Sequence, residues 1–182
     1  MIRLANGHDA ALNDLMERHA PAVVRFLCRL LNNEDDANDL AQETFVRVFQ
    51  ARRNFDPNKK FSPWLFTIAA NLARNQIRWR TRHPNVSLDA EGEAGEQSLV
   101  GRLQANAPTP KEHVLSEERI AAVRAAVQAL PEDMRLAFVL CEWEERSMAE
   151  AAAILEVTPK AVESRLYRAR QLLRAQLQSW LT

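Results

Sequence analysis

The chain has 182 residues, and its 24 Lys and Arg residues balance its 24 Asp and Glu residues. Its hydrophobic share of 47% allows a real core, and the presence of only four glycines and one tyrosine favours helices over sheets. The two cysteines, Cys28 and Cys141, form no CxxC pair, and the four histidines show no ligand spacing. We therefore expect an all-α protein that needs no metal and no cofactor. No signal peptide and no apolar run of membrane-spanning length is present, which predicts a cytoplasmic protein without membrane insertion.

Residues 9–31 show apolar side chains at spacings of three and four, which predicts an amphipathic helix. Pro21 interrupts this run, so we expect it to kink the helix or to separate two helices. The polar segment 32–36 then breaks the pattern and supplies capping residues for a new helix.

The next predicted helix covers residues 35–53 and has an apolar side. Its opposite side carries Asp36, Asp39, Gln42 and Glu43. Acidic residues near a helix N-terminus favour the helix dipole, which explains Asp36 well. Asp39, Gln42 and Glu43 lie a turn or more inside the helix, so an acidic and amide patch that docks a basic partner is the alternative.

The segment from Phe61 to Pro84 mixes apolar, aromatic, amide and arginine side chains. No acidic residue occurs between Asp56 and Asp89, and an acid-free basic segment is the electrostatic signature of a polyanion site. Its last arginines are Arg74, Arg78, Arg80 and Arg82.

As a helix, at about 100° per residue, the same segment has two adjacent stripes. The apolar stripe consists of Phe61, Leu65, Ile68, Leu72 and Trp79. The second stripe consists of Trp64, Asn71, Asn75, Arg78 and Arg82. An indole can stack on an unpaired base, amides can bind base edges and guanidiniums can bind phosphates. On this segment alone, an ordinary amphipathic helix with a solvated basic face explains the pattern equally well.

Residues 85–112 have a different composition, with three of the four glycines, two prolines and an acidic first half. This composition predicts a flexible linker, with a helical turn near residues 99–103. The linker divides the chain into helical domains at 1–84 and 113–182. In the second domain, Ser116 is expected to cap a helix whose apolar face consists of Ile120, Val123, Val127 and Leu130.

The last part of the chain has the pattern of a helix-turn-helix. Ser147 and Glu150 have the spacing of a capping box, and Thr158 with Pro159 suits the start of a second helix. That helix is expected to present Lys160, Glu163, Ser164, Tyr167, Arg168 and Arg170 outward. A recognition helix inserts such a face into the major groove of DNA. A helical hairpin with a basic surface is the alternative.

Three segments in this order resemble the extracytoplasmic-function (ECF) sigma factors of bacterial RNA polymerase. They are DDANDLAQETFVRVF, FSPWLFTIAANLARNQIRWRTR and the segment from LPEDMR to RARQLLR. The resemblance implies a subunit that docks on core RNA polymerase, reads promoter DNA and is held inactive by an anti-sigma factor. It also implies that Asn71 lies in a loop beside a pocket for a flipped base. Glu156 stands where the family often has glycine, and Glu163 stands where it often has a basic residue.

The residue patterns and the resemblance together predict three groups of contact residues. The group for core polymerase is Asp36, Asp39, Leu40, Gln42 and Glu43. The group for the −10 element is Trp64, Asn71, Arg74, Asn75, Arg78, Arg80 and Arg82. The group for the −35 element is Lys160, Glu163, Ser164, Tyr167, Arg168 and Arg170.

Two other functions fit part of the sequence. A free-standing helix-turn-helix regulator would bind operators as a dimer, but no long heptad seam is visible to hold one together. It would also leave the pattern of residues 35–84 unexplained. A protein-interaction decoy that binds no DNA is the other alternative. No residue pattern points to enzymatic activity.

Overall fold

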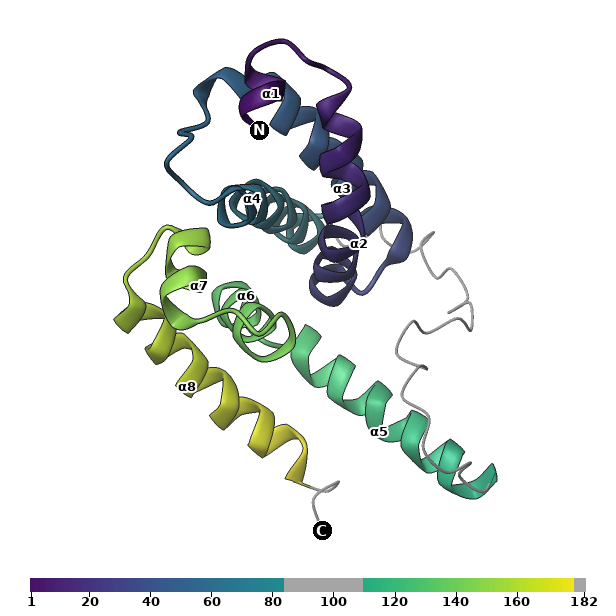
Figure 1. Ribbon diagram of the computed structural model, residues 1–182. Helices are drawn as coiled ribbons and strands as arrows, with labels where there is room; N and C mark the ends of the chain where they lie inside the picture. The colour runs from purple at the N-terminus through teal and green to yellow at the C-terminus, as the bar shows by residue number, and fades with distance from the viewer. Residues whose placement is uncertain (84–109, 179–182) are drawn as a thin grey trace.

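The computed structural model describes residues 1–83 and 110–178, with side chains from residue 117 onward in the second segment (Figure 1). All regular elements in these two segments are helical, which confirms the predicted all-α class. The linker prediction, including its turn at residues 99–103, lies almost entirely outside the described residues. No helix in the described segments combines the length and apolarity that a membrane span requires.

The first domain consists of four α-helices and one short 3-10 turn. Their bounds are α1 Ile2–Ala5, α2 Ala11–Leu31, α3 Glu34–Gln50, η1 Arg52–Asn54 and α4 Phe61–Arg82. Helices α2, α3 and α4 pack against one another around a core that includes Phe26, Phe45 and Phe66. The rings of Phe26 and Phe66 lie 5.2 Å apart, centre to centre.

Helix α2 runs through Pro21 without a break, so the expectation of two separate helices was wrong. Proline removes one backbone donor, which leaves the carbonyl four residues earlier without its helical partner. Here Pro21 and Glu17 are both exposed, so water can satisfy that carbonyl. The fully buried side chains of Val23, Phe26 and Leu27 hold the rest of the helix against the core.

Helix α3 begins one residue before its predicted start and ends three residues before its predicted end. Asn33 caps it, because its side chain accepts a hydrogen bond of 2.8 Å from the backbone N–H of Asp36. The residues that follow Gln50 form η1 instead of continuing the helix.

Helix α4 is continuous through Asn71, so the expected loop at this position was wrong. The apolar stripe was correct for Leu65 and Leu72, which are buried, but wrong for Trp79. Trp79 is 40% exposed and stacks on His83, with 5.0 Å between the ring centres. It lies near the end of α4, beyond the last buried residue of the helix, Ala73.

The second domain consists of four α-helices and a π-helical turn. Their bounds are α5 Pro110–Gln128, α6 Glu132–Phe138, η3 Val139–Trp143, α7 Met148–Leu155 and α8 Pro159–Gln176. Ser116 lies inside α5, so its expected capping role was wrong. The helix begins at Pro110 instead, which agrees with the preference of proline for the first helical turn. On the predicted apolar face Val127 is buried, but Ile120 and Val123 are 42% and 37% exposed.

The two domains are in contact, and α4 is the helix of the first domain that contacts the second domain most (Figure 1). Helices α2 and α3 cover one side of α4, while α7 and the start of α6 lie against another. This double cover explains why Ala69, Ala70 and Ala73 are buried although the sequence placed only one stripe of α4 inward. Helix α8 packs on α6 and α7, and it lies on the side of the second domain away from α4 (Figure 1).

Candidate nucleic-acid interface

The basic face of α4 meets an acidic residue of the second domain. Glu132, the first residue of α6, lies between two predicted DNA contacts. Its Oε1 is 3.2 Å from Nε of Arg74, and its Oε2 is 2.9 Å from Nε of Arg78. Arg74 also donates a hydrogen bond of 2.9 Å to the side-chain oxygen of Asn71. The structure therefore brings Asn71, Arg74 and Arg78 together, with Glu132 against both guanidiniums.

The remaining predicted contacts on this helix differ in exposure. Asn75 and Arg82 are exposed. Arg80 forms an ion pair with Asp36 of α3, although the sequence assigned these two residues to different partners. Arg80 also donates to the carbonyl of Leu31 over 3.4 Å, and burial lowers the pKa of its guanidinium. Arg80 thus ties the end of α4 to the start of α3.

Trp64 lies in an aromatic cluster at the start of α4. Its ring centre is 5.1 Å from that of Phe55 and 6.0 Å from that of Phe61. Trp64 is only partly buried, so one part of its ring packs in the cluster and another part reaches the surface. The sequence prediction included neither phenylalanine, because Phe55 precedes the helix and Phe61 belongs to its apolar stripe.

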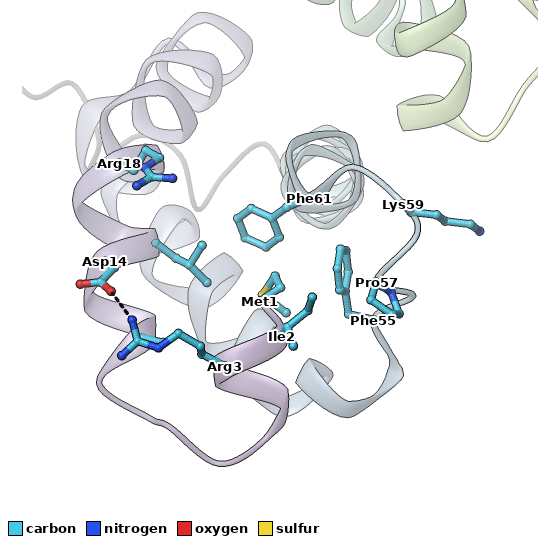
Figure 2. Close-up of a pocket in the computed structure, with 11 residues that line it drawn as sticks. Met1, Ile2, Arg3, Asp14, Arg18, Phe55, Pro57, Lys59 and Phe61 are labelled. Atoms are coloured by element: carbon cyan, nitrogen blue, oxygen red, sulfur yellow. Dashed lines mark ion pairs between the residues drawn. The ribbon is translucent and has the colours of Figure 1, made fainter.

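A surface pocket of about 400 Å³ opens beside this cluster, between α1, α2 and the loop before α4. Figure 2 shows that Phe55, Phe61 and Met1 line the pocket together. Three basic side chains also line it: Arg3, Arg18 and Lys59. None of the predicted site residues lines this pocket, because no sequence signal indicates that α1 folds back against the loop.

The predicted docking patch occupies an open part of α3. Asp39 and Gln42 are exposed, and Leu40 is half-buried. Glu43 accepts a hydrogen bond of 2.8 Å from Arg47, one turn later. Val46 follows Asp39 and Gln42 on the same side and is 47% exposed. The sequence prediction omitted this valine, although its spacing of three to seven residues from the acidic and amide residues could have revealed it.

The helix-turn-helix forms as the sequence predicts. Ser147 and Glu150 complete the capping box that begins α7, and Thr158 accepts a hydrogen bond from the backbone of Ala161 at the start of α8. The turn contains Glu156 in a left-handed conformation, with φ of 55° and ψ of 43°. The backbone therefore keeps the geometry that glycine favours, and the side chain of Glu156 does not change it.

The outer face of α8 is open to solvent. Tyr167 is 64% exposed, and Arg168 donates a hydrogen bond of 2.9 Å to Ser164 one turn earlier. Lys160 and Glu163 form an exposed ion pair of 2.8 Å. Arg170 reaches Glu142 of the same domain at 2.5 Å. All six predicted −35 contacts thus lie on one helix.

Within the described residues, no group of three or more histidine, cysteine or acidic side chains could hold a metal ion. Burial raises the pKa of both Cys28 and Cys141, which keeps each thiol in its less reactive protonated form.

Comparisons with known proteins identify the family of the chain. The Sigma-70 region 2 family matches residues 15–83, and the Sigma-70 region 4 family matches residues 120–173. The ECF RNA polymerase sigma factor SigW of Bacillus subtilis is 33% identical over 177 residues, which are 96% of this chain and 93% of SigW. SigE of Mycolicibacterium smegmatis is 38% identical, and the match covers 93% of this chain but only 64% of SigE.

Two solved structures have a similar fold. The structure of CnrH in complex with the cytosolic domain of CnrY gives a TM-score of 0.71 at 28% identity, covering 98% of this chain and 94% of CnrH. The sigma factor RpoE of Bartonella quintana, in complex with the anti-sigma factor NepR, gives 0.64 at 26% identity, covering 91% and 96%. With both sigma regions present and relatives matched over almost the whole chain, the protein belongs to the ECF sigma factors of the sigma-70 family.

Proposed function

We propose that this sigma factor uses three separate faces, one for core polymerase and two for promoter DNA. As a member of its family it is an alternative sigma factor that directs promoter-specific transcription. The observation that carries the detailed assignment is the placement of three polar faces on three different helices, α3, α4 and α8. A helix-turn-helix regulator that acted alone would need only the last.

Helix α4 is the −10 reader in this proposal. Its arginines bind phosphates and position the strand, while the amides of Asn71 and Asn75 meet base edges. The pocket of Figure 2 receives an unpaired base, because its two phenyl rings can stack with a base. Arg18 and Lys59 at its rim suit the phosphates of the strand, while Arg3 pairs with Asp14. Trp64 connects the two parts, since its ring packs against both phenylalanines of the pocket.

Helix α8 is the −35 reader. Its exposed face places Tyr167 and Ser164 for base contacts, with Arg168 and Lys160 for phosphates. Glu163 can accept a hydrogen bond from a cytosine amino group, although it repels phosphate. Because each small domain makes few contacts, we expect tight promoter binding only when polymerase holds both domains at the same DNA.

Helix α3 docks on the polymerase through Asp39, Leu40, Gln42 and Glu43, with Val46 as an apolar contact at its centre. The polymerase core performs the chemistry, so the protein acts as a subunit in the cytoplasm and not as an enzyme. An anti-sigma factor is the expected regulator. The complex of Bartonella RpoE with NepR, a structure with a similar fold, supports this partner.

Run-off transcription with purified core polymerase tests the proposal. Core with this protein should start at a defined subset of promoters, whereas core alone should not. Asn71→Ala should change the preferred −10 base and leave core binding intact. Unchanged promoter choice would remove the assignment of Asn71.

A second experiment tests the docking face. Replacing Asp39 and Glu43 with lysine should weaken assembly with core, measured by co-elution or by light scattering. Replacing Asp9 and Glu17, two exposed acidic residues outside α3, with lysine makes the same change of charge and is the control. Normal assembly of the α3 variant would contradict the docking assignment.

A further inference from the structure

The contact of Glu132 with α4 occupies charges that the proposed function assigns to DNA. The carboxylate of Glu132 has one oxygen near each guanidinium, at 3.2 Å from Arg74 and 2.9 Å from Arg78. The side chains of Glu132 and Arg74 are each 18% exposed, so this pair is largely shielded from solvent. A DNA phosphate is also an anion with several acceptor oxygens, and it needs the same two guanidiniums.

The rest of the domain contact holds Glu132 in this position. Arg29 of α2 forms an ion pair of 2.7 Å with Glu144, which follows the π-helical turn η3. The side chain of Glu144 is only 5% exposed, and Nε of Arg25 lies 3.9 Å from the same carboxylate oxygen. Arg29 also donates to the carbonyl of Trp143 and lies over its ring, 5.7 Å from the centre.

Further contacts extend along the same seam. Gln128 donates a hydrogen bond of 3.0 Å to the carbonyl of Arg29, and Arg135 donates one of 3.2 Å to the carbonyl of Leu30. Arg146 lies over the ring of Phe66, 4.6 Å from its centre, and reaches Ser62 at 3.3 Å. The contact therefore joins the second domain to both α2 and α4 through directional bonds.

We propose that this closed arrangement is autoinhibitory, with Glu132 acting as an internal substitute for a DNA phosphate on Arg74 and Arg78. The inference rests on the assignment of α4 to DNA made above. Glu132 occupies the Nε donors of both guanidiniums, so a phosphate can take this paired site only when the second domain moves away. The docking face of α3 and the −35 face of α8 stay exposed, so polymerase or duplex DNA can bind the closed form first.

A binding measurement with the full chain tests this proposal. The probe is a fluorescein-labelled single-stranded DNA of about 24 nucleotides and mixed sequence, long enough to cover the first domain. Its affinity is measured by fluorescence anisotropy between about 50 and 200 mM NaCl. Glu132→Gln keeps the shape of the side chain but removes its charge. Glu145→Gln is the matched control, because it makes the same change of charge at an exposed position of the neighbouring loop.

Glu132→Gln should bind the probe about tenfold more tightly than the natural protein, and Glu145→Gln should stay within about twofold. Two newly available phosphate contacts should also steepen the plot of log K against log salt by about 1.4. Glu144→Arg should give the same gain, because it puts a third positive charge beside Arg25 and Arg29 and separates the domains. Small-angle X-ray scattering should then show a larger radius of gyration. Should that variant fail to fold, Glu132→Gln still decides the question.

Equal affinity and equal salt dependence of Glu132→Gln and the natural protein would overturn the autoinhibition. If run-off transcription still succeeds, the proposed function survives that result. Adding Arg74→Ala and Arg78→Ala to Glu132→Gln should abolish the gain. A gain that persists without these arginines would contradict both the masking and the assignment of α4 to DNA.

Discussion

Helices α4 and α8 each carry arginines, an aromatic residue and small polar side chains along one face. The two faces differ in how far solvent can reach them. On α8 the side chains of Lys160 and Tyr167 are 83% and 64% exposed. On α4 the side chain of Arg74 is 18% exposed, because the second domain lies against it. A basic helical face in a sequence therefore indicates what a helix can bind. Whether the face is open depends on contacts between residues far apart in the chain.

The largest expected effect comes from removing the arginine at the centre of the domain contact. Arg29→Ala leaves the buried carboxylate of Glu144 without its closest partner, and breaking a buried ion pair typically costs about 3 kcal/mol. Urea unfolding should show this loss. Arg25→Ala is the matched control, since Arg25 is 53% exposed and lies 3.9 Å from Glu144, so it should cost less than about 1 kcal/mol. Equal losses for the two variants would contradict the central role of Arg29.

The same pair predicts a dependence on pH. Burial raises the pKa of Glu144 above its ordinary value of 4.5, although Arg29 and Arg25 act in the opposite direction. The folded chain then binds this proton more tightly than the unfolded chain. The protonated Glu144 carboxyl therefore contributes to the free energy of unfolding below pH 4.5, and this contribution is lost as the pH rises through the raised pKa.

Without Arg29 the pKa should rise further, so the cost of Arg29→Ala should be about 1 kcal/mol larger at pH 8 than at pH 5. Urea unfolding at both pH values measures the difference. A cost that does not change with pH would mean that Glu144 is not the group left unpaired.

A smaller effect is expected on α8, which the closed arrangement leaves open. Arg168→Ala should weaken binding to duplex DNA by about fivefold and reduce the salt slope by about 0.9, the value for one phosphate contact. Glu132→Gln should leave the contribution of Arg168 unchanged. Measuring duplex binding of Arg168→Ala in the natural protein and in the Glu132→Gln variant tests whether the two faces are independent. A marked difference between the two effects would show that the faces are coupled.

The smallest effect concerns the turn of the helix-turn-helix. Glu156 adopts φ of 55°, where a residue with a Cβ atom is disfavoured. Glu156→Gly should stabilise the protein by about 0.5–1 kcal/mol, the steric gain less the added freedom of the unfolded chain. Glu156→Ala should give no such gain in thermal unfolding, because alanine keeps the Cβ atom. A comparable gain from both would point to the charge of Glu156 as the cause.

Local sequence signals predicted most of the helical fold. Ser147 and Thr158 cap their helices as expected, and the cap of α3 comes from the predicted polar segment 32–36, because a capping bond involves only residues three positions apart. Pro21 and Ser116 were misinterpreted, since tertiary packing and a proline at the true helix start outweighed the local preference. The expectation of a loop at Asn71 came from the family resemblance, and the alanine-rich, doubly covered middle of α4 stays helical instead.

The candidate faces were predicted less completely. Periodicity placed Tyr167 and Arg168 outward on α8, because that helix is covered on one side only. It could not show that Arg74 and Arg78 meet Glu132, which lies more than fifty positions away in the sequence. Periodicity could not predict the pocket beside Phe55 either, because its walls come from three separate segments: α1, α2 and the loop before α4.

The π-helical turn η3 makes the domain contact depend on how tightly the helix is wound. Its wide turn is marked by a hydrogen bond of 3.0 Å from the N–H of Glu144 to the carbonyl of Val139, five positions earlier. Because this turn holds one residue more than an α-helical turn, Trp143 and Glu144 lie about one residue position, roughly 100°, behind their places in a continuous α-helix. A substitution that returned the turn to α-helical winding would therefore turn Trp143 and Glu144 away from Arg29. The winding of η3, with no change in charge, would thus set how readily the −10 face opens.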